Sequence, residues 1–206
     1  MRIIHVAMQR LTTYCLLLFM CSFSATALAA LDYQVEIELE APADIKPLLT
    51  QHLDIFRWRD NPALDDVQLR RIYRLTPENI NTLLATAGYF SPKITSALQE
   101  QGGIFKASFS VEPGEPSRVV NTAISAQGAI TDDPEHYQTW LQAQQKQWQL
   151  KNGEVFTQAA WDTAKLSLLT SLVINQYPKA QLLHSKAEVN PDTHQVTLNL
   201  LIDSGA

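Results

Sequence analysis

Four histidines follow position 30 and are the first residues to test for catalysis or metal binding: His52, His136, His184 and His194. None of them combines a second His, Asp or Glu at the i, i+4 spacing of a helical metal pair with residues that predict a pocket. His52 lies on an apolar face of a predicted helix, where packing explains it better than ligation does. His184 and Ser185 are neighbours in a predicted strand, so they point to opposite faces and cannot act as base and nucleophile. We therefore expect no catalytic residue, no metal site and no enzymatic activity.

Motifs for nucleotide or acyl chemistry are also missing from the sequence. The chain has no G-x-S-x-G, no phosphate-binding loop and no dinucleotide fingerprint, and Gly102-Gly103 has the composition of a turn. Both cysteines, Cys15 and Cys21, precede position 30, in a segment that we predict to be removed. The remaining chain then has no disulfide and no cysteine nucleophile or ligand, and we expect no cofactor.

Basic residues gather with aromatic residues in two places, Arg57-Trp58-Arg59 and Arg70-Arg71-Ile72-Tyr73-Arg74. Two interpretations fit these clusters. They are a solvated connector and helix face, or they form a docking patch for an acidic or anionic partner. The sequence leaves both open. The other tryptophans, Trp140, Trp148 and Trp161, have the helical spacing of core residues.

The first 29 residues have the pattern of a secretory signal peptide. Arg2 and Arg10 form a basic region, Leu11–Phe23 is an apolar core of 13 residues, and Ala27-Leu28-Ala29 is a small-x-small cleavage site. An uncleaved membrane anchor is the alternative, although a spanning helix needs about 20 apolar residues. Cleavage removes two arginines and no acidic residue, so the formal charge changes from −5 to −7. That charge argues against binding to nucleic acid or to a broad anionic membrane surface.

The stretch Thr76–Pro92 predicts a helix, an abrupt stop and a new strand. Thr76 can cap the helix with its hydroxyl, and the next residue is a proline, which suits the first helical position. Leu75 and Ile80 have the spacing of a hydrophobic staple. Gly88-Tyr89 then form a predicted structural turn, in which the glycine takes the left-handed conformation that ends a helix.

Around this stretch, the spacing of apolar residues predicts the same order of elements twice. The first half has a strand over 33–40, a helix over 43–56, a helix over 67–75 capped by Asp65, the Thr76 helix, and strands over 93–99 and 105–112. The second half has a strand over 118–125, a helix over 134–148 capped by Asp133, a helix over 157–175, and strands over 181–188 and 195–203. The caps Thr76 and Thr157 are 81 residues apart and the aromatic residues Tyr89 and Tyr177 are 88 apart, which predicts a longer second helix.

The inward positions of these elements predict two separate cores. The first should contain Leu49, Ile80, Leu84, Phe105 and Phe109, and the second Trp161, Leu168, Val196 and Leu200. Between the two halves, Pro113-Gly114-Glu115-Pro116 has two prolines in four residues, which predicts a short, stiff joint.

The repeated β-α-α-β-β order resembles a POTRA domain. The sequence marks are the Gly88-Tyr89-Phe90 helix stop and the V-x-P-G-x-P exit over 111–116, which contains the predicted turn Pro113-Gly114. The matching segments are 83–92, 111–114, 156–172 and 202–205. Two such modules in tandem, over 31–114 and 117–206, resemble the periplasmic arm of the Omp85 superfamily, and within it the TamA branch. The resemblance implies an α+β fold in which each module packs a three-stranded mixed sheet, with the third strand central, on two helices.

The same resemblance implies a non-enzymatic periplasmic module of a complex that assembles and translocates outer-membrane proteins and autotransporters. The implied partners are an inner-membrane TamB-like protein and unfolded outer-membrane protein clients. The implied location is the periplasmic face of the outer membrane of a Gram-negative bacterium. The module would be attached to the outer membrane through a C-terminal barrel. That barrel either follows Ala206 in a longer chain or belongs to a separate chain. The alternative is a signal-anchored POTRA protein of a division or secretion complex.

One predicted strand is the expected partner-binding segment, because it should lie at the edge of its sheet. A hairpin at Gly102-Gly103 pairs only one of its sides with the central strand. Its residues are Lys93, Ile94, Thr95, Ser96, Ala97, Leu98 and Gln99. With one charge and no proline, this edge is lightly protected against pairing with another chain. Two explanations stay open: neighbouring loops cover the edge, or it receives an extended segment through main-chain hydrogen bonds.

Overall fold

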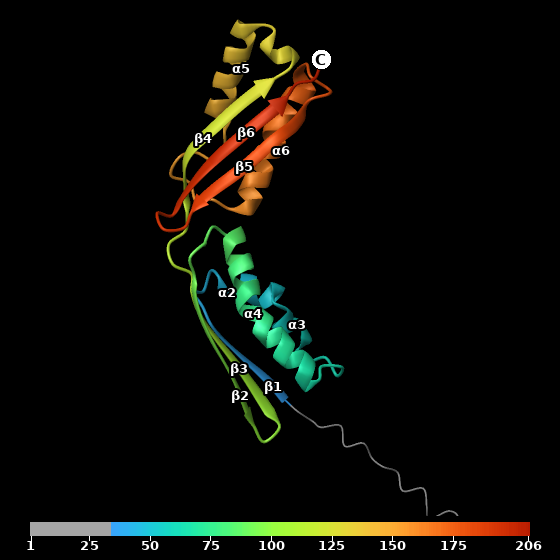
Figure 1. Cartoon of the computed structure of the whole chain (residues 1–206), viewed down its shortest axis with the longest axis vertical. Coiled ribbons are helices and arrows are strands. Elements are labelled where there is room, and N and C mark those ends of the chain that lie inside the picture. Colours follow the sequence, from blue (N-terminus) through green and yellow to red (C-terminus); the bar gives the residue numbers. More distant parts are fainter. Residues whose placement is uncertain (1–33) are drawn as a thin grey trace, which may run out of the picture. The chain divides into compact units, whose positions relative to one another are not determined.

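A computed structural model describes residues 34–206, which form an α+β structure with two three-stranded sheets (Figure 1). The predicted signal peptide lies outside the described residues. The first module consists of β1 (Gln34–Glu40), α2 (Lys46–His52), α3 (Asp54–Trp58), α4 (Asp66–Thr86), β2 (Lys93–Gln101) and β3 (Ile104–Glu112). The second consists of β4 (Arg118–Gln127), the short 3-10 helix η2 (Ala129–Thr131), α5 (Pro134–Gln147), α6 (Gln158–Asn175), β5 (Gln181–Asn190) and β6 (Gln195–Asp203).

The two sheets have the same topology. Their strand orders are β1-β3-β2 and β4-β6-β5, so the third strand of each module is central, as the resemblance implies. The central strand pairs in parallel with the first strand of its module and antiparallel with the second. Parallel pairing requires a long crossover, and the helices between the first and second strands supply it. Tandem mixed sheets, each with helices on one face, confirm the predicted fold class (Figure 1).

Each module buries the alternate residues of its central strand. In β3 the buried residues are Phe105, Ala107, Phe109 and Val111, and in β6 they are Val196, Leu198, Leu200 and Ile202. All residues predicted for the first core are buried. All those predicted for the second lie in one apolar cluster, together with Trp148, Phe156 and Leu172. The alternation on these strands therefore identified the helix-covered face of both sheets.

The stretch predicted as two helices in the first module is one helix, α4, and the proposed cap at Thr76 is wrong. Asp65 caps α4 instead, and its carboxylate accepts a hydrogen bond from the backbone of Gln68. Thr76 is buried inside the helix and donates to the carbonyl oxygen of Ile72 at 2.8 Å. Leu75 is 51% exposed, so it forms no hydrophobic staple.

The buried face of α4 explains why the helix continues through a proline. Its buried residues recur at helical spacing on both sides of Pro77: Leu69, Ile72, Thr76, Ile80 and Leu84. A proline inside a helix costs about 3 kcal/mol, and burial of a long continuous face offsets that cost. The expectation of a longer second helix is also wrong, because α4 has 21 residues and α6 has 18.

The first predicted helix is broken into α2 and α3 at Leu53, whose ψ of 130° is extended. Leu49, Leu53 and Ile55 are buried. Ile55 is six residues after Leu49 and would point away from it on one continuous helix, and the break turns both residues inward. His52 is exposed, so its predicted place on an apolar face is wrong.

Gly88 ends α4 with a φ of 95°, as the sequence predicts. The backbone of Gly88 donates to Ala85 and that of Tyr89 donates to Leu84, which is the Schellman arrangement of a helix C-terminus. The Gly88 carbonyl then accepts a hydrogen bond from the backbone of Ser117 at 2.8 Å. A Cβ at Gly88 would collide with the carbonyl oxygen of Phe156. Both this collision and the positive φ therefore exclude a side chain at this position. After β3, Gly114 also has positive φ, at 76°.

Candidate docking site at the edge of the first sheet

Strand β2 is an edge of the first sheet, and no strand among residues 34–206 pairs with its outer side. It pairs with β3 over nine consecutive residues without a register shift. Only Ile94 and Leu98 are partly buried, and the other residues of the strand are exposed. The strand contains no proline. It is therefore a regular edge that another strand can extend.

The turn beside β2 fixes which of its backbone groups face outward. Gly102 and Gly103 both have positive φ, 60° and 84°, which identifies a two-residue hairpin turn of the type I′ class. The residues that flank such a turn, Gln101 and Ile104, exchange hydrogen bonds, and bonded pairs then alternate along the ladder. By this count, odd-numbered residues such as Thr95 bond to β3. The N–H and C=O groups of Ile94, Ser96, Leu98 and Glu100 point outward.

A groove runs along β2 on the side of the sheet that α4 covers. It encloses about 600 Å³ and is lined by Asp66, Val67, Arg70, Tyr73, Arg74 and Leu98. Two side-chain contacts tie the helix to the strand. The hydroxyls of Tyr73 and Ser96 are 3.1 Å apart, and Arg70 donates to the Glu100 carboxylate at 2.6 Å. The groove therefore adjoins the outward backbone groups of β2 at Leu98.

The two arginines of the groove differ in their partners. Arg70 also donates to Asp66 at 2.7 Å and lies over the Phe105 ring, 5.3 Å from its centre. The hydrogen bond to Glu100 raises the pKa of Arg70, and Asp66 adds to this effect while burial opposes it. Arg74 is exposed and its Nε donates only weakly, at 3.4 Å, to the carbonyl oxygen of Arg70. Among the described residues, no carboxylate forms an ion pair with Arg74.

The structure joins two features that the sequence presented separately. In the sequence, the basic cluster at residues 70–74 and the predicted edge strand were separate candidate docking surfaces. In the structure, two arginines of that cluster, Arg70 and Arg74, line the groove beside the edge strand. The sequence interpretation missed Asp66 and Val67. Val67 is apolar, yet 76% of its surface is exposed. An apolar residue at a position outside the buried face of the helix was the sequence signal that could have identified it as a surface contact residue. No residue of the other cluster lines the groove, and its arginines form local ion pairs, Arg57 with Asp54 and Arg59 with Asp60.

The edges of the second sheet are built differently. The pairing of β5 with β6 shifts between Leu182 and His184, which leaves Leu183 as an extra residue, and the pairing of β4 shifts after Val119. Part of β4 is also covered. The backbone of Val119 donates to Glu154 at 2.9 Å and accepts from Gly153 at 2.8 Å. Bulges and covering segments both reduce pairing with foreign strands.

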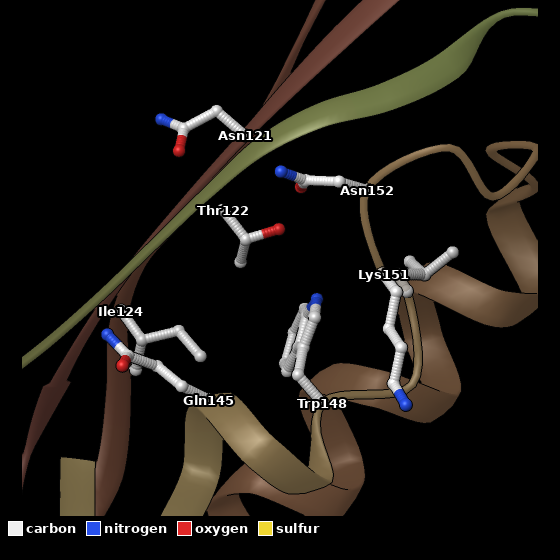
Figure 2. Close-up of a pocket in the computed structure, with 8 residues that line it drawn as sticks. Asn121, Thr122, Ile124, Gln145, Trp148, Lys151 and Asn152 are labelled. Atoms are coloured by element: carbon white, nitrogen blue, oxygen red, sulfur yellow. The ribbon is translucent and has the colours of Figure 1, made fainter. Parts of the chain in front are cut away.

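A second concavity lies beyond this covering segment, between β4 and the end of α5 (Figure 2). It encloses about 250 Å³. The Thr122 hydroxyl and the Trp148 indole N–H point into it, and neither has a hydrogen-bond partner among the described residues. Asn152 borders the same space, while the Lys151 ammonium group points away from it (Figure 2). This hollow therefore presents two buried polar groups with no partner among the described residues.

The described part of the chain contains no cluster of metal-ligating side chains. None of its helices combines the length and the apolar character that crossing a membrane requires.

Comparison with known families agrees with this architecture. Residues 34–113 match the family model of the first POTRA domain of TamA. This segment, the first module, is similar to the TamA POTRA family. POTRA domains of Omp85-family proteins are periplasmic interaction modules at the outer membrane, and they are not catalytic. No curated protein sequence matches the chain.

Several solved POTRA structures are similar in fold. The POTRA3–5 region of BamA from Haemophilus influenzae has 12% identity and a TM-score of 0.40, with 84% of this chain and 66% of that chain covered. BamA from Haemophilus ducreyi lacking POTRA domains 1–3 has 16% identity and a TM-score of 0.39, with 82% and 28% covered. The N-terminal domain of Omp85 from Thermosynechococcus elongatus has 15% identity and a TM-score of 0.39, with 82% and 61% covered. The chain thus spans less than two thirds of each, and similarities this distant carry no conclusion about function.

Proposed function

We propose that this protein is a non-enzymatic periplasmic module that docks extended polypeptides by adding them as a strand to β2. The observation that carries the proposal is the regular edge of β2, nine residues long, without bulge or proline. Backbone hydrogen bonds supply affinity in this mode, so it makes little demand on the sequence of the bound segment. The backbone groups of Ile94, Ser96 and Leu98 would make those bonds.

Both partner classes that follow from the TamA resemblance suit this mode. Unfolded outer-membrane protein clients contain many segments that form strands, and the C-terminal region of a TamB-like inner-membrane protein is the second candidate. We further propose that residues 1–29 are removed during export. N-terminal sequencing of the exported protein should then begin at Ala30, and a start at Met1 would favour the anchored alternative.

The test of strand addition compares two variants of one residue. Ser96→Pro removes an outward N–H, whereas Ser96→Ala keeps that N–H and removes only the hydroxyl. Binding of a labelled, unfolded outer-membrane protein to the full chain would be measured by fluorescence anisotropy. We expect about a tenfold weaker affinity for Ser96→Pro, because a lost hydrogen bond and a distorted edge together reach about 1.4 kcal/mol. Ser96→Ala should bind as the parent does.

A thermal melt of each variant shows whether it is folded. A folded Ser96→Pro protein that binds with undiminished affinity would exclude β2 as the docking strand.

A further inference from the structure

The groove beside β2 gives the docking edge a chemical preference, which rests on the proposed function. A strand added to β2 places alternate side chains on the side of the sheet that α4 covers. Those side chains enter the space lined by Val67, Arg74 and Leu98. The other alternate side chains lie on the open face. Half of the bound segment is therefore exposed to the groove and half is not.

The contacts between α4 and β2 set the order of groups along the groove. Arg70 contacts Glu100, and Tyr73 contacts Ser96, so the helix and the strand run in opposite directions. Val67 and Arg74 are seven residues apart on α4, about 10.5 Å along the helix axis. Val67 therefore lies toward the Glu100 end of the groove and Arg74 toward the Ser96 end, with Leu98 between them. Leu98 and Ser96 are two residues apart on one face, a separation of about 6.6 Å along a strand. The apolar Leu98 side chain and the basic end of the groove at Arg74 are thus one alternate position apart.

The charges in the groove determine which side chain of a bound segment is preferred at its basic end, beside Arg74. Arg70 is occupied by the carboxylates of Asp66 and Glu100. Arg74 lines the same groove, is exposed, and forms no ion pair with a carboxylate in the described part of the chain. The net charge of the sequence is −5, so an acidic segment is repelled by the molecule as a whole, and Arg74 supplies a local attraction beside the edge. A carboxylate is the group that a guanidinium without such a partner binds best.

We propose that the groove recognises extended segments that carry a carboxylate and an apolar side chain two residues apart. The carboxylate pairs with Arg74, and the apolar side chain packs against Leu98. Main-chain pairing with β2 holds the segment, and the two side chains set its register and its direction. Segments with a lysine in place of the carboxylate bind in the same mode but more weakly.

Synthetic peptides test this preference directly. Four peptides of about ten residues would have threonine at alternate positions and differ only in their central three residues. Two carry glutamate, as Glu-Thr-Val and Val-Thr-Glu, and two carry lysine in its place, as Lys-Thr-Val and Val-Thr-Lys. Anisotropy with the full chain at physiological salt gives their affinities. An exposed ion pair contributes about 0.2–1 kcal/mol, so we expect one glutamate peptide to bind up to about fivefold more tightly than its lysine counterpart. The better of the two orders reports the direction of the added strand.

Charge reversal on the helix provides the matched control. Arg74→Glu should invert the preference toward the lysine peptide. Arg71→Glu changes the same charge on the same helix, at a residue that does not line the groove, and should leave the order of affinities unchanged. Equal affinity for glutamate and lysine peptides, or the same effect from both reversals, would overturn the proposal.

The experiment separates this inference from the proposed function. If Ser96→Pro weakens all four peptides while Arg74→Glu does not alter their order, strand addition stands and the charge preference fails. If Ser96→Pro leaves every affinity unchanged, the docking edge itself is excluded. Dimers that form in the absence of peptide and that Ser96→Pro disrupts would show that a second copy occupies the edge, which also contradicts the preference.

Discussion

The second strands of the two modules, β2 and β5, hold the same place in the same topology, yet they differ as surfaces. Each is an edge strand paired antiparallel with the central strand of its sheet. β2 is regular, and the groove beside it contains arginine. β5 contains a bulge at Leu183, and α6 beside it exposes Leu166 and Ile174. A repeated fold therefore preserves the core and the strand order while each copy acquires its own edge.

The C-terminal ends of the two long helices, α4 and α6, also differ between the modules. α4 ends on Gly88 with positive φ, whereas the residue that caps α6, Gln176, has a φ of −154°. The glycine is required because a neighbouring carbonyl approaches it closely. The second module reaches a similar turn before Tyr177 without a left-handed residue, so the departure from Gly-Tyr-Phe in its sequence leaves the topology intact.

The largest expected effect is at Gly88, and it tests whether the close approach matters beyond backbone conformation. Gly88→Val should lower the free energy of unfolding by about 2–4 kcal/mol, through left-handed strain and the collision with Phe156. Gly153→Val is the matched control, because Gly153 has a φ of 91° and open space around it. The control should lose only about 1–2 kcal/mol. Chemical denaturation measures both, and equal losses would mean that the contact with Phe156 has no effect.

The next effect separates the two sides of β2. Thr95→Pro removes an N–H that bonds to β3 and should lower the free energy of unfolding by about 1–2 kcal/mol. Ser96→Pro, one residue along the strand, removes an outward N–H and should cost less than about 1 kcal/mol. Thermal melts compare the two variants. If Ser96→Pro is the more destabilised, the deduced alternation of hydrogen bonds along β2 is wrong.

A smaller effect on stability, with a clear effect on association, is expected from removing the bulge in β5. Deleting Leu183 joins Leu182 to His184 and keeps both in their present registers with β6. Unfolding free energy should change by less than about 1 kcal/mol. The edge then becomes regular like β2, so sedimentation should show more self-association than for the parent. An unchanged monomer fraction would show that the bulge does not protect this edge.

The smallest effect concerns an ion pair on α6 of the second module. A hydrogen bond from Lys165 lowers the pKa of Asp162, and Gln158 adds to it. A carboxylate with a lowered pKa in the folded state stabilises the protein above its unfolded pKa, near 3.8. That contribution disappears as pH falls through the folded pKa. In Lys165→Met, an NMR titration should show the Asp162 pKa closer to its ordinary value, while the pKa of Glu188, which Lys186 lowers, stays unchanged.

Much of the fold could be predicted from local patterns. Alternation of apolar and polar residues identified β1, β3 and β6, since a strand with one buried face has a sequence period of two. Asp65, Asp133 and Thr157 were identified as helix caps because their side chains bond within one turn. The errors fell where a local signal was overruled. Thr76 and the proline after it resemble a helix start, but burial of one continuous face keeps α4 intact.

The candidate site was only half visible in the sequence. The edge strand followed from the hairpin at Gly102-Gly103 and the expected central strand. Its union with the arginine cluster did not, because residues 70–74 and 94–100 are far apart in the chain. Their proximity depends on how α4 crosses the sheet. No spacing rule within one element contains that information.

The sequence by itself determined the order of the elements, the faces that they bury and the left-handed stop at Gly88, because these depend on contacts within a few residues. Only the tertiary structure decided which strand edges stay regular, which arginine of the groove forms no ion pair with a carboxylate, and which carbonyl approaches Gly88. Those properties arise where α4, β2 and the loop before α6 meet residues distant in the chain. Side-chain burial and pairing at such meetings depend on the packed arrangement and not on local propensity.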